Sequence, residues 1–225
     1  MPEAEGDREV RIAVARSIKT RGKILTIAAV AADMGKDVAA IDAAFARMIE
    51  DRVFRPRKDS DEIYAYSPFC VGPTDFFVTT GGRIWFAIDA WDALGVPAAL
   101  GESGVIETHC ADCGESLVVD VDADGATELQ TWTVMQVGVP ARDFWKDIAY
   151  TESTINLFKS EEHAERWRDK HKPPASAFLP IEQATALAHE WYKNKLDPDW
   201  RRYTTEEAEA IFDELALDPE FWRLS

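Results

Sequence analysis

Two carboxylates at close spacing are the residues of this sequence that most suggest chemistry. Asp89 and Asp92 are three positions apart, so on a helix both side chains lie on one face. Carboxylates held together in a partly apolar setting repel each other, and one then keeps a proton near neutral pH. Such a pair would serve as a general acid and base or would hold a hard divalent cation. The structural alternative is that Asp89 caps the helix while Asp92 is solvated.

A second group consists of Cys110 and Cys113, which follow His109 and precede Gly114. This spacing resembles half of a zinc site, but zinc takes about four ligands and the sequence has no second such pair. We therefore interpret the two as buried structural thiols, with a zinc or redox role as the alternative. The remaining cysteine, Cys70, is distant in sequence. An odd total of 3 argues against a disulfide framework and suits a reducing compartment.

Composition narrows the class of protein. The 225 residues are 46% hydrophobic and 29% charged, as in ordinary folded globular chains. No apolar run approaches the roughly 18–20 residues that span a bilayer, and the acidic N-terminus lacks a secretory pattern. We expect a soluble cytoplasmic protein, monomeric or homodimeric, with no membrane partner. The formal net charge of −16 also argues against a nucleic-acid partner.

The elements that would position these residues begin with a predicted winged helix-turn-helix domain over residues 1–70. Apolar spacing and turn residues predict its parts as follows: helices at 8–21, 27–34 and 38–51, and strands at 53–55 and 63–66 joined by a turn at 58–61. A DNA-reading third helix should offer basic and amide groups. This one exposes mostly acidic residues, among them Asp42 and Glu50. We therefore interpret the domain as a structural scaffold.

A core at 71–196 and a helical extension at 197–225 complete the predicted organisation. The core and extension patterns predict strands at 76–79, 84–86, 105–108, 116–121, 132–137 and 154–158, and helices at 88–95, 161–170, 181–196 and 204–216. The helix at 88–95 would end at Gly95 and carry the two aspartates near its start. The aromatic side chains of the extension must be buried either by wrapping the core or in a dimer contact, and we expect wrapping.

Several motifs in this order resemble the organomercurial (alkylmercury) lyase family. They are Ser67-Pro68-Phe69, Pro73-Thr74, the run Phe86-Ala87-Ile88-Asp89-Ala90-Trp91-Asp92-Ala93-Leu94-Gly95, Thr108-His109-Cys110, a strand at 151–158, and the helices at 161–171 and 181–196. The similarity covers about residues 8–196. It implies an α+β fold, with the winged helix-turn-helix followed by a mixed β-sheet core and flanking helices.

The resemblance also implies a chemistry that uses two cysteines and one aspartate. In that family the thiolates capture mercury, and the aspartate shuttles the proton that cleaves the carbon–mercury bond. Carried over to this sequence, the aspartate falls on Asp92 and the first cysteine on Asp89. The second cysteine falls on Glu152, or on Ser153 if the register slips by one. We therefore expect a divergent member that lacks the mercury-binding cysteines.

Carboxylates in place of thiolates change the expected substrate, because thiolates select soft metals and carboxylates suit hard cations. The expected site residues are Asp89, Asp92 and Glu152 for catalysis or for a divalent metal, Trp85, Trp91 and Ser153 for substrate contact, and Cys110 and Cys113 as a lesser metal candidate. Whether any cofactor is needed stays open between none and a divalent metal. The predicted function is a lyase that cleaves a carbon–carbon or carbon–heteroatom bond in a small non-mercurial substrate, cationic if no metal binds. The alternatives are a non-catalytic metal-binding or sensing protein and a winged-helix regulator.

Overall fold

Three helices and a short strand pair form the N-terminal part of the computed structural model, which describes residues 4–57, 62–125 and 132–225. These elements are α1 (Glu5–Arg21), α2 (Ile27–Met34), α3 (Val38–Glu50), β1 (Arg55–Pro56) and β2 (Ile63–Tyr66). The side chains of Thr26 and Asp37 accept hydrogen bonds from the first turns of α2 and α3. The expected helices and the strand at 63–66 are present, the strand expected at 53–55 begins only at Arg55, and the assignment as a winged helix-turn-helix stays a prediction. The predicted turn at 58–61 lies outside the described residues.

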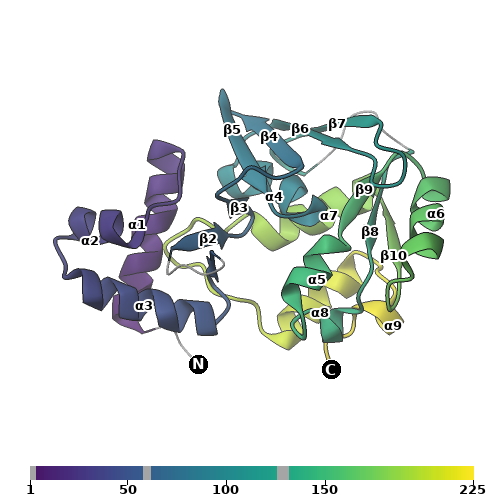
Figure 1. Ribbon diagram of the computed structural model, residues 1–225. Helices are drawn as coiled ribbons and strands as arrows, with labels where there is room; N and C mark the ends of the chain where they lie inside the picture. Colours follow the sequence, from purple (N-terminus) through teal and green to yellow (C-terminus); the bar gives the residue numbers. More distant parts are fainter. Residues whose placement is uncertain (1–3, 58–61, 126–131) are drawn as a thin grey trace.

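The strands in the described ranges form two antiparallel sheets (Figure 1). The larger has the order β1-β2-β3-β5-β4-β6-β7, and the smaller has the order β10-β8-β9. Their further strands are β3 (Phe69–Cys70), β4 (Phe76–Thr80), β5 (Arg83–Ala87), β6 (Gly104–His109), β7 (Ser116–Val121), β8 (Val134–Val137), β9 (Asn156–Phe158) and β10 (Ala177–Pro180). Every pairing among the described strands is antiparallel, so the predicted mixed sheet is wrong. Tight turns such as the one between β4 and β5 join antiparallel neighbours, whereas parallel strands need long crossovers.

Helix α4 (Ala90–Leu100) packs against the larger sheet and against α7 (Ile181–Tyr192). The predicted end of this helix at Gly95 is wrong, because the helix continues to Leu100 and stops at Gly101, which has a φ of 67°. Gly95 serves close packing instead. A Cβ at this position would lie 2.0 Å from Cδ2 of Tyr192. The glycine therefore lets α7 approach α4 and brings Tyr192 to the helix that carries Asp89 and Asp92.

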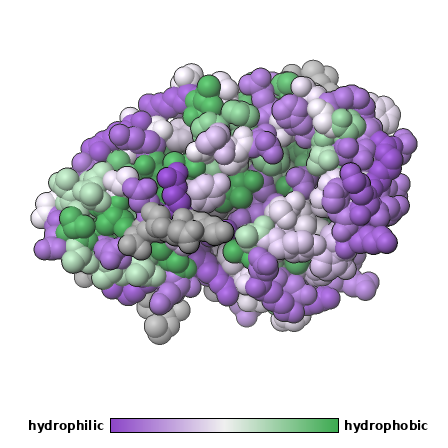
Figure 2. Space-filling model, in the orientation of Figure 1, coloured by the Kyte–Doolittle hydropathy of each residue, from purple (hydrophilic) through white to green (hydrophobic). Residues whose placement is uncertain are grey.

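The C-terminal half adds α5 (Ile148–Ser153), α6 (Glu161–His171), α8 (Thr205–Glu214) and α9 (Pro219–Trp222), with a short 3-10 turn at Ala141–Asp143. Helix α6 is highly charged, and Figure 2 shows dense hydrophilic side chains at the end of the molecule where Figure 1 places α6. The expected wrapping by the extension is confirmed. Trp222 is 2% exposed, and its ring centroid lies 5.7 Å from that of Trp91. None of the helices in the described ranges is long and apolar enough to cross a membrane.

Candidate active site

The start of α4 places Asp89 and Asp92 side by side. Asp89 is the N-cap, and its Oδ1 accepts a hydrogen bond from the amide of Asp92 at 2.9 Å. Each of the two aspartates is 4% exposed. Asp89 therefore both caps the helix and belongs to a buried carboxylate pair, and the alternative of a solvated Asp92 is wrong.

Tyr192, the last residue of α7, contacts this pair from the opposite side. Its hydroxyl donates to Oδ1 of Asp92 at 2.5 Å, and both groups are buried. Ser67 also hydrogen-bonds the Asp92 side chain. The Asp92 carboxyl group is therefore held in one orientation by hydroxyls from two segments that are far apart in the sequence.

Glu152 reaches the same site from α5. It forms an ion pair with Arg55 of β1, and its side chain is 12% exposed. The predicted strand at 151–158 is wrong for its first residues, because Glu152 and Ser153 end a helix that Asp147 caps at the amide of Tyr150. The strand begins only at Asn156. The expected gathering of three carboxylates is present, with Arg55 as an additional partner.

Burial shifts the protonation of all three acids. Burial raises the pKa of Asp89 well above its usual value, and the charges of Asp92 and Glu152 raise it further. Burial also raises the pKa of Asp92, although the hydrogen bonds from Tyr192 and Ser67 oppose the change. Burial raises the pKa of Glu152 to about 7 against the opposing effect of Arg55. The group therefore holds a proton at a pH where a solvated aspartate is ionised.

A cavity of about 380 Å³ opens onto these carboxylates. Five basic side chains line it beside the three acids: Arg52, Arg55, Arg142, Lys195 and Arg202. Trp145 lies between two of these cations, with Arg52 at 4.7 Å and Arg202 at 5.4 Å from its ring centroid. The cavity wall therefore has more basic than acidic side chains, although the whole chain has a formal net charge of −16.

The predicted substrate contacts divide between the cavity and the core. Trp91 lines the cavity. Trp85 does not line it, since its ring lies on the buried side of β5 against Phe69, with centroids 5.0 Å apart. Ser153 is exposed, and its hydroxyl donates to the carbonyl of Tyr150 at 2.6 Å. Neither Trp85 nor Ser153 is therefore placed to contact a molecule in the cavity.

Cys70 is a member of this neighbourhood that sequence reasoning missed. Cys70 on β3 pairs with Phe86 on β5, and Phe86 precedes Asp89 by three positions. The thiol of Cys70 also hydrogen-bonds Tyr64. Burial, together with the charge of Asp92, raises the pKa of Cys70 to about 12. The pairing of β3 with β5 brings Cys70 here, and no local signal in the sequence reveals that register.

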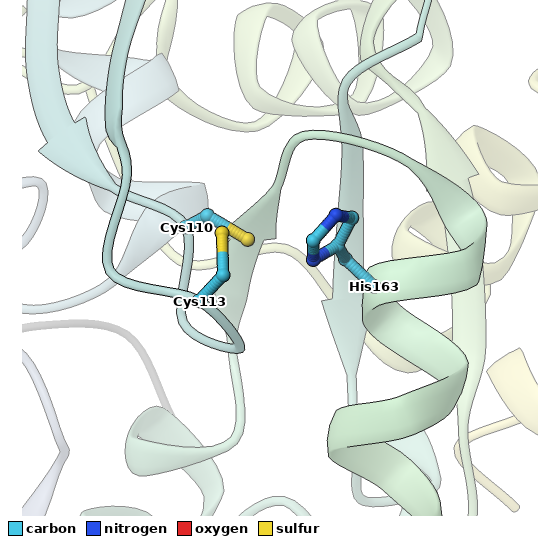
Figure 3. A group of neighbouring side chains, drawn as sticks. All are labelled: Cys110, Cys113 and His163. Carbon is cyan, nitrogen blue, oxygen red and sulfur yellow. The ribbon is translucent and has the colours of Figure 1, made fainter.

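A thiol cluster lies apart from the cavity. One donor atom each from Cys110, Cys113 and His163 lies within 4.8 Å of the other two (Figure 3). Cys110 is buried and Cys113 is exposed, and both are free thiols. The structure adds His163 of α6 to the pair, a third donor that the spacing of Cys110 and Cys113 does not predict.

Comparisons with known proteins agree on one family. The profile of the family described as alkylmercury lyase (MerB) matches residues 69–193. The chain belongs to the alkylmercury lyase family. It is 30% identical over 115 residues to alkylmercury lyases of Bacillus cereus and Clostridium butyricum, which covers 51% of this chain and 52% of each relative. The chain thus matches about half the length of these relatives.

A solved structure described as the mercury-bound form of MerB2 shares the α+β fold of this alkylmercury lyase family member. The TM-score is 0.67 at 22% identity, and the match covers 86% of this chain and 93% of that one. The expectation of a member without mercury-binding cysteines is wrong, because Cys110, Cys113 and His163 form a cluster that resembles a mercury-binding site. Cys110 and Cys113 were expected only as a lesser metal candidate, and His163, which joins them through a tertiary contact, was missed.

Proposed function

We propose that this alkylmercury lyase family member breaks a bond to carbon in a small molecule by proton transfer from the Asp89–Asp92 pair. The observation that carries the proposal is the presence of two carboxyl groups, each 4% exposed, in the wall of one cavity. Buried acids with raised pKa values serve as general acids near neutral pH. Membership of a lyase family supports the same class of reaction.

Asp92 is the proposed proton donor. The hydroxyls of Tyr192 and Ser67 both hydrogen-bond this carboxyl group and orient the acid whose proton is transferred. In the reaction the acid gives this proton to the substrate carbon, and the electron pair of the broken bond forms the new carbon–hydrogen bond. The other fragment leaves without that electron pair, as carbon dioxide leaves a carboxylate. Water then returns a proton to Asp92.

The cavity wall favours an anionic substrate over the cationic one expected from the sequence. Five basic and three acidic side chains line the cavity, and the buried aspartates have raised pKa values. Protonation of these acids leaves the wall with net positive charge, which attracts anions. A small carboxylate is the substrate class that fits both this charge and the proposed chemistry.

The state of Cys70 supports a non-mercurial substrate for this cavity. Soft metals bind thiolates, and a thiol with a pKa of about 12 keeps its proton at neutral pH. The alternative of a metal-binding protein is favoured by a different observation, the thiol cluster at Cys110, Cys113 and His163.

The experiment compares the wild type with Asp92→Asn and with Asp120→Asn, an exposed aspartate on β7 that serves as the control. Thermal unfolding is measured with a panel of small carboxylates and alkyl amines, and NMR in D₂O follows cleavage of each carboxylate that binds. We expect carboxylates to stabilise the protein more than amines do. Asp92→Asn should slow cleavage at least about 100-fold, and Asp120→Asn should not.

Two results would count against the proposal. Equal cleavage by Asp92→Asn and the wild type would remove Asp92 as the proton donor. Fast release of benzene from phenylmercuric acetate, measured by gas chromatography in the presence of a thiol, would replace the carboxylate with an organomercurial as the substrate.

A further inference from the structure

The turn between β6 and β7 holds two thiols in a rigid arrangement. The amide of Cys110 donates to the carbonyl of Glu115, and the amide of Gly114 donates to the carbonyl of Cys110, both at 2.8 Å. Gly114 has a φ of 75°, a left-handed conformation that suits glycine. The amide of Ala111 donates to the carbonyl of Leu157 at 3.2 Å and ties the turn to β9. The chain therefore fixes the positions of the two cysteines without any added ligand.

The first turn of α6 supplies a third donor, His163. Its Nδ1 lies 2.7 Å from Oδ2 of Asp112, which is itself held by Arg166 at 2.7 Å. Carboxylates commonly hold one nitrogen of a metal-binding histidine and thereby orient the ring. Nη2 of Arg166 also lies 2.6 Å from Nδ1, so the imidazole is held in place, and one of its two nitrogens lies within 4.8 Å of both sulfurs.

This donor set matches the chemistry of zinc. Zn²⁺ binds thiolates and imidazole, and sites with three protein ligands leave a fourth position for water or an external molecule. In a tetrahedral site with metal–sulfur bonds of about 2.3 Å the two sulfurs are about 3.8 Å apart. The donor atoms here, all within 4.8 Å of one another, need only a small adjustment to reach that geometry.

We propose that Cys110, Cys113 and His163 bind one Zn²⁺ ion with an open fourth position, and that Asp112 is the positioning residue for His163. The ion would join the β6–β7 turn to α6. None of the three ligands lines the cavity of the carboxylates. The site therefore stands apart from the proposed lyase activity, and either proposal can fail without the other.

The test uses the full chain, purified under reducing conditions and stripped of metal with a chelator. Competition with a chromophoric chelator gives the Zn²⁺ affinity, and mass spectrometry of the metal gives the stoichiometry. We expect one Zn²⁺ per chain. Cys113→Ser and His163→Gln should each weaken binding at least about 100-fold, and Asp112→Asn should weaken it about 10-fold. His171→Gln, an exposed histidine on the same helix, is the matched control and should bind as the wild type does.

Two further readouts separate metal binding from misfolding. Co²⁺ in place of Zn²⁺ should give thiolate charge-transfer absorption that is reduced in Cys113→Ser. Zn²⁺ should raise the unfolding temperature of the wild type and of Asp92→Asn, but not that of His163→Gln. Substoichiometric Zn²⁺ in the reduced wild type, or wild-type affinity in His163→Gln, would overturn the proposal.

Discussion

Glu152 should make the protein less stable as the pH rises. Its pKa is about 7 in the folded chain against the usual 4.5, because burial outweighs the effect of Arg55. Between these values the folded protein keeps a proton that the unfolded chain has lost, so the free energy of unfolding falls as the pH increases. The side chain is 12% exposed, which leaves little screening by solvent. For these two pKa values the contribution of Glu152 falls by about 2 to 3 kcal/mol between pH 5 and pH 8.

The substitution Glu152→Gln removes this titration. Urea unfolding followed by tryptophan fluorescence gives the free energy of unfolding of both proteins at several pH values from 5 to 8. The difference, variant minus wild type, should increase by about 2 to 3 kcal/mol over this range. Asp89 and Asp92 are present in both proteins, so their own titration cancels to first order.

A control substitution and a clear negative result complete this test. Glu214→Gln changes an exposed glutamate at the end of α8 and should give a difference that does not vary with pH. A difference for Glu152→Gln that stays constant within about 0.5 kcal/mol, or that decreases as the pH rises, would refute the raised pKa and its cause in burial.

Three further substitutions test the packing around the carboxylate pair. Tyr192→Phe removes the 2.5 Å hydrogen bond that lowers the pKa of Asp92. Carbon NMR of the Asp92 carboxyl group should therefore show a higher pKa in the variant, and an unchanged pKa would contradict this effect of Tyr192. Asp89→Ala removes the N-cap acceptor of α4, so it should be about 1 kcal/mol less stable in urea than Asp89→Asn, which keeps an acceptor; equal stability would argue against capping. Gly95→Ala would place a Cβ 2.0 Å from Cδ2 of Tyr192 and should cost about 3 kcal/mol or more in urea unfolding; wild-type stability would mean that α4 and α7 can separate at little cost.

Much of the helical structure was predicted from signals a few residues long. Thr26, Asp37 and Thr204 precede helices, and each accepts a hydrogen bond from the first turn, as their residue types predict. The spacing of Asp89 and Asp92 likewise predicted that both lie on one helix face. The order of motifs predicted the family, which the match over 69–193 confirms.

Other features of the site depend on contacts between segments that are distant in the sequence. Gly95 has the residue type of a helix end, but the ring of Tyr192 packs against it and the helix continues. Glu152 lies in a segment predicted as a strand, and it meets Arg55 of β1 through an ion pair between residues that are distant in the sequence. Such packing is decided by the fit of whole elements, which overrides local preference.

Asp89 and Asp92 show where local information ends. Their residue types and spacing alone determined that they share a helix face and that one of them caps the helix. Only the tertiary structure decided that both are buried, that Tyr192 and Cys70 lie beside them, and that His163 meets the two cysteines elsewhere. The physical reason is that burial and pKa depend on every element packed around a group, while a cap or a helix face depends on neighbours within one turn.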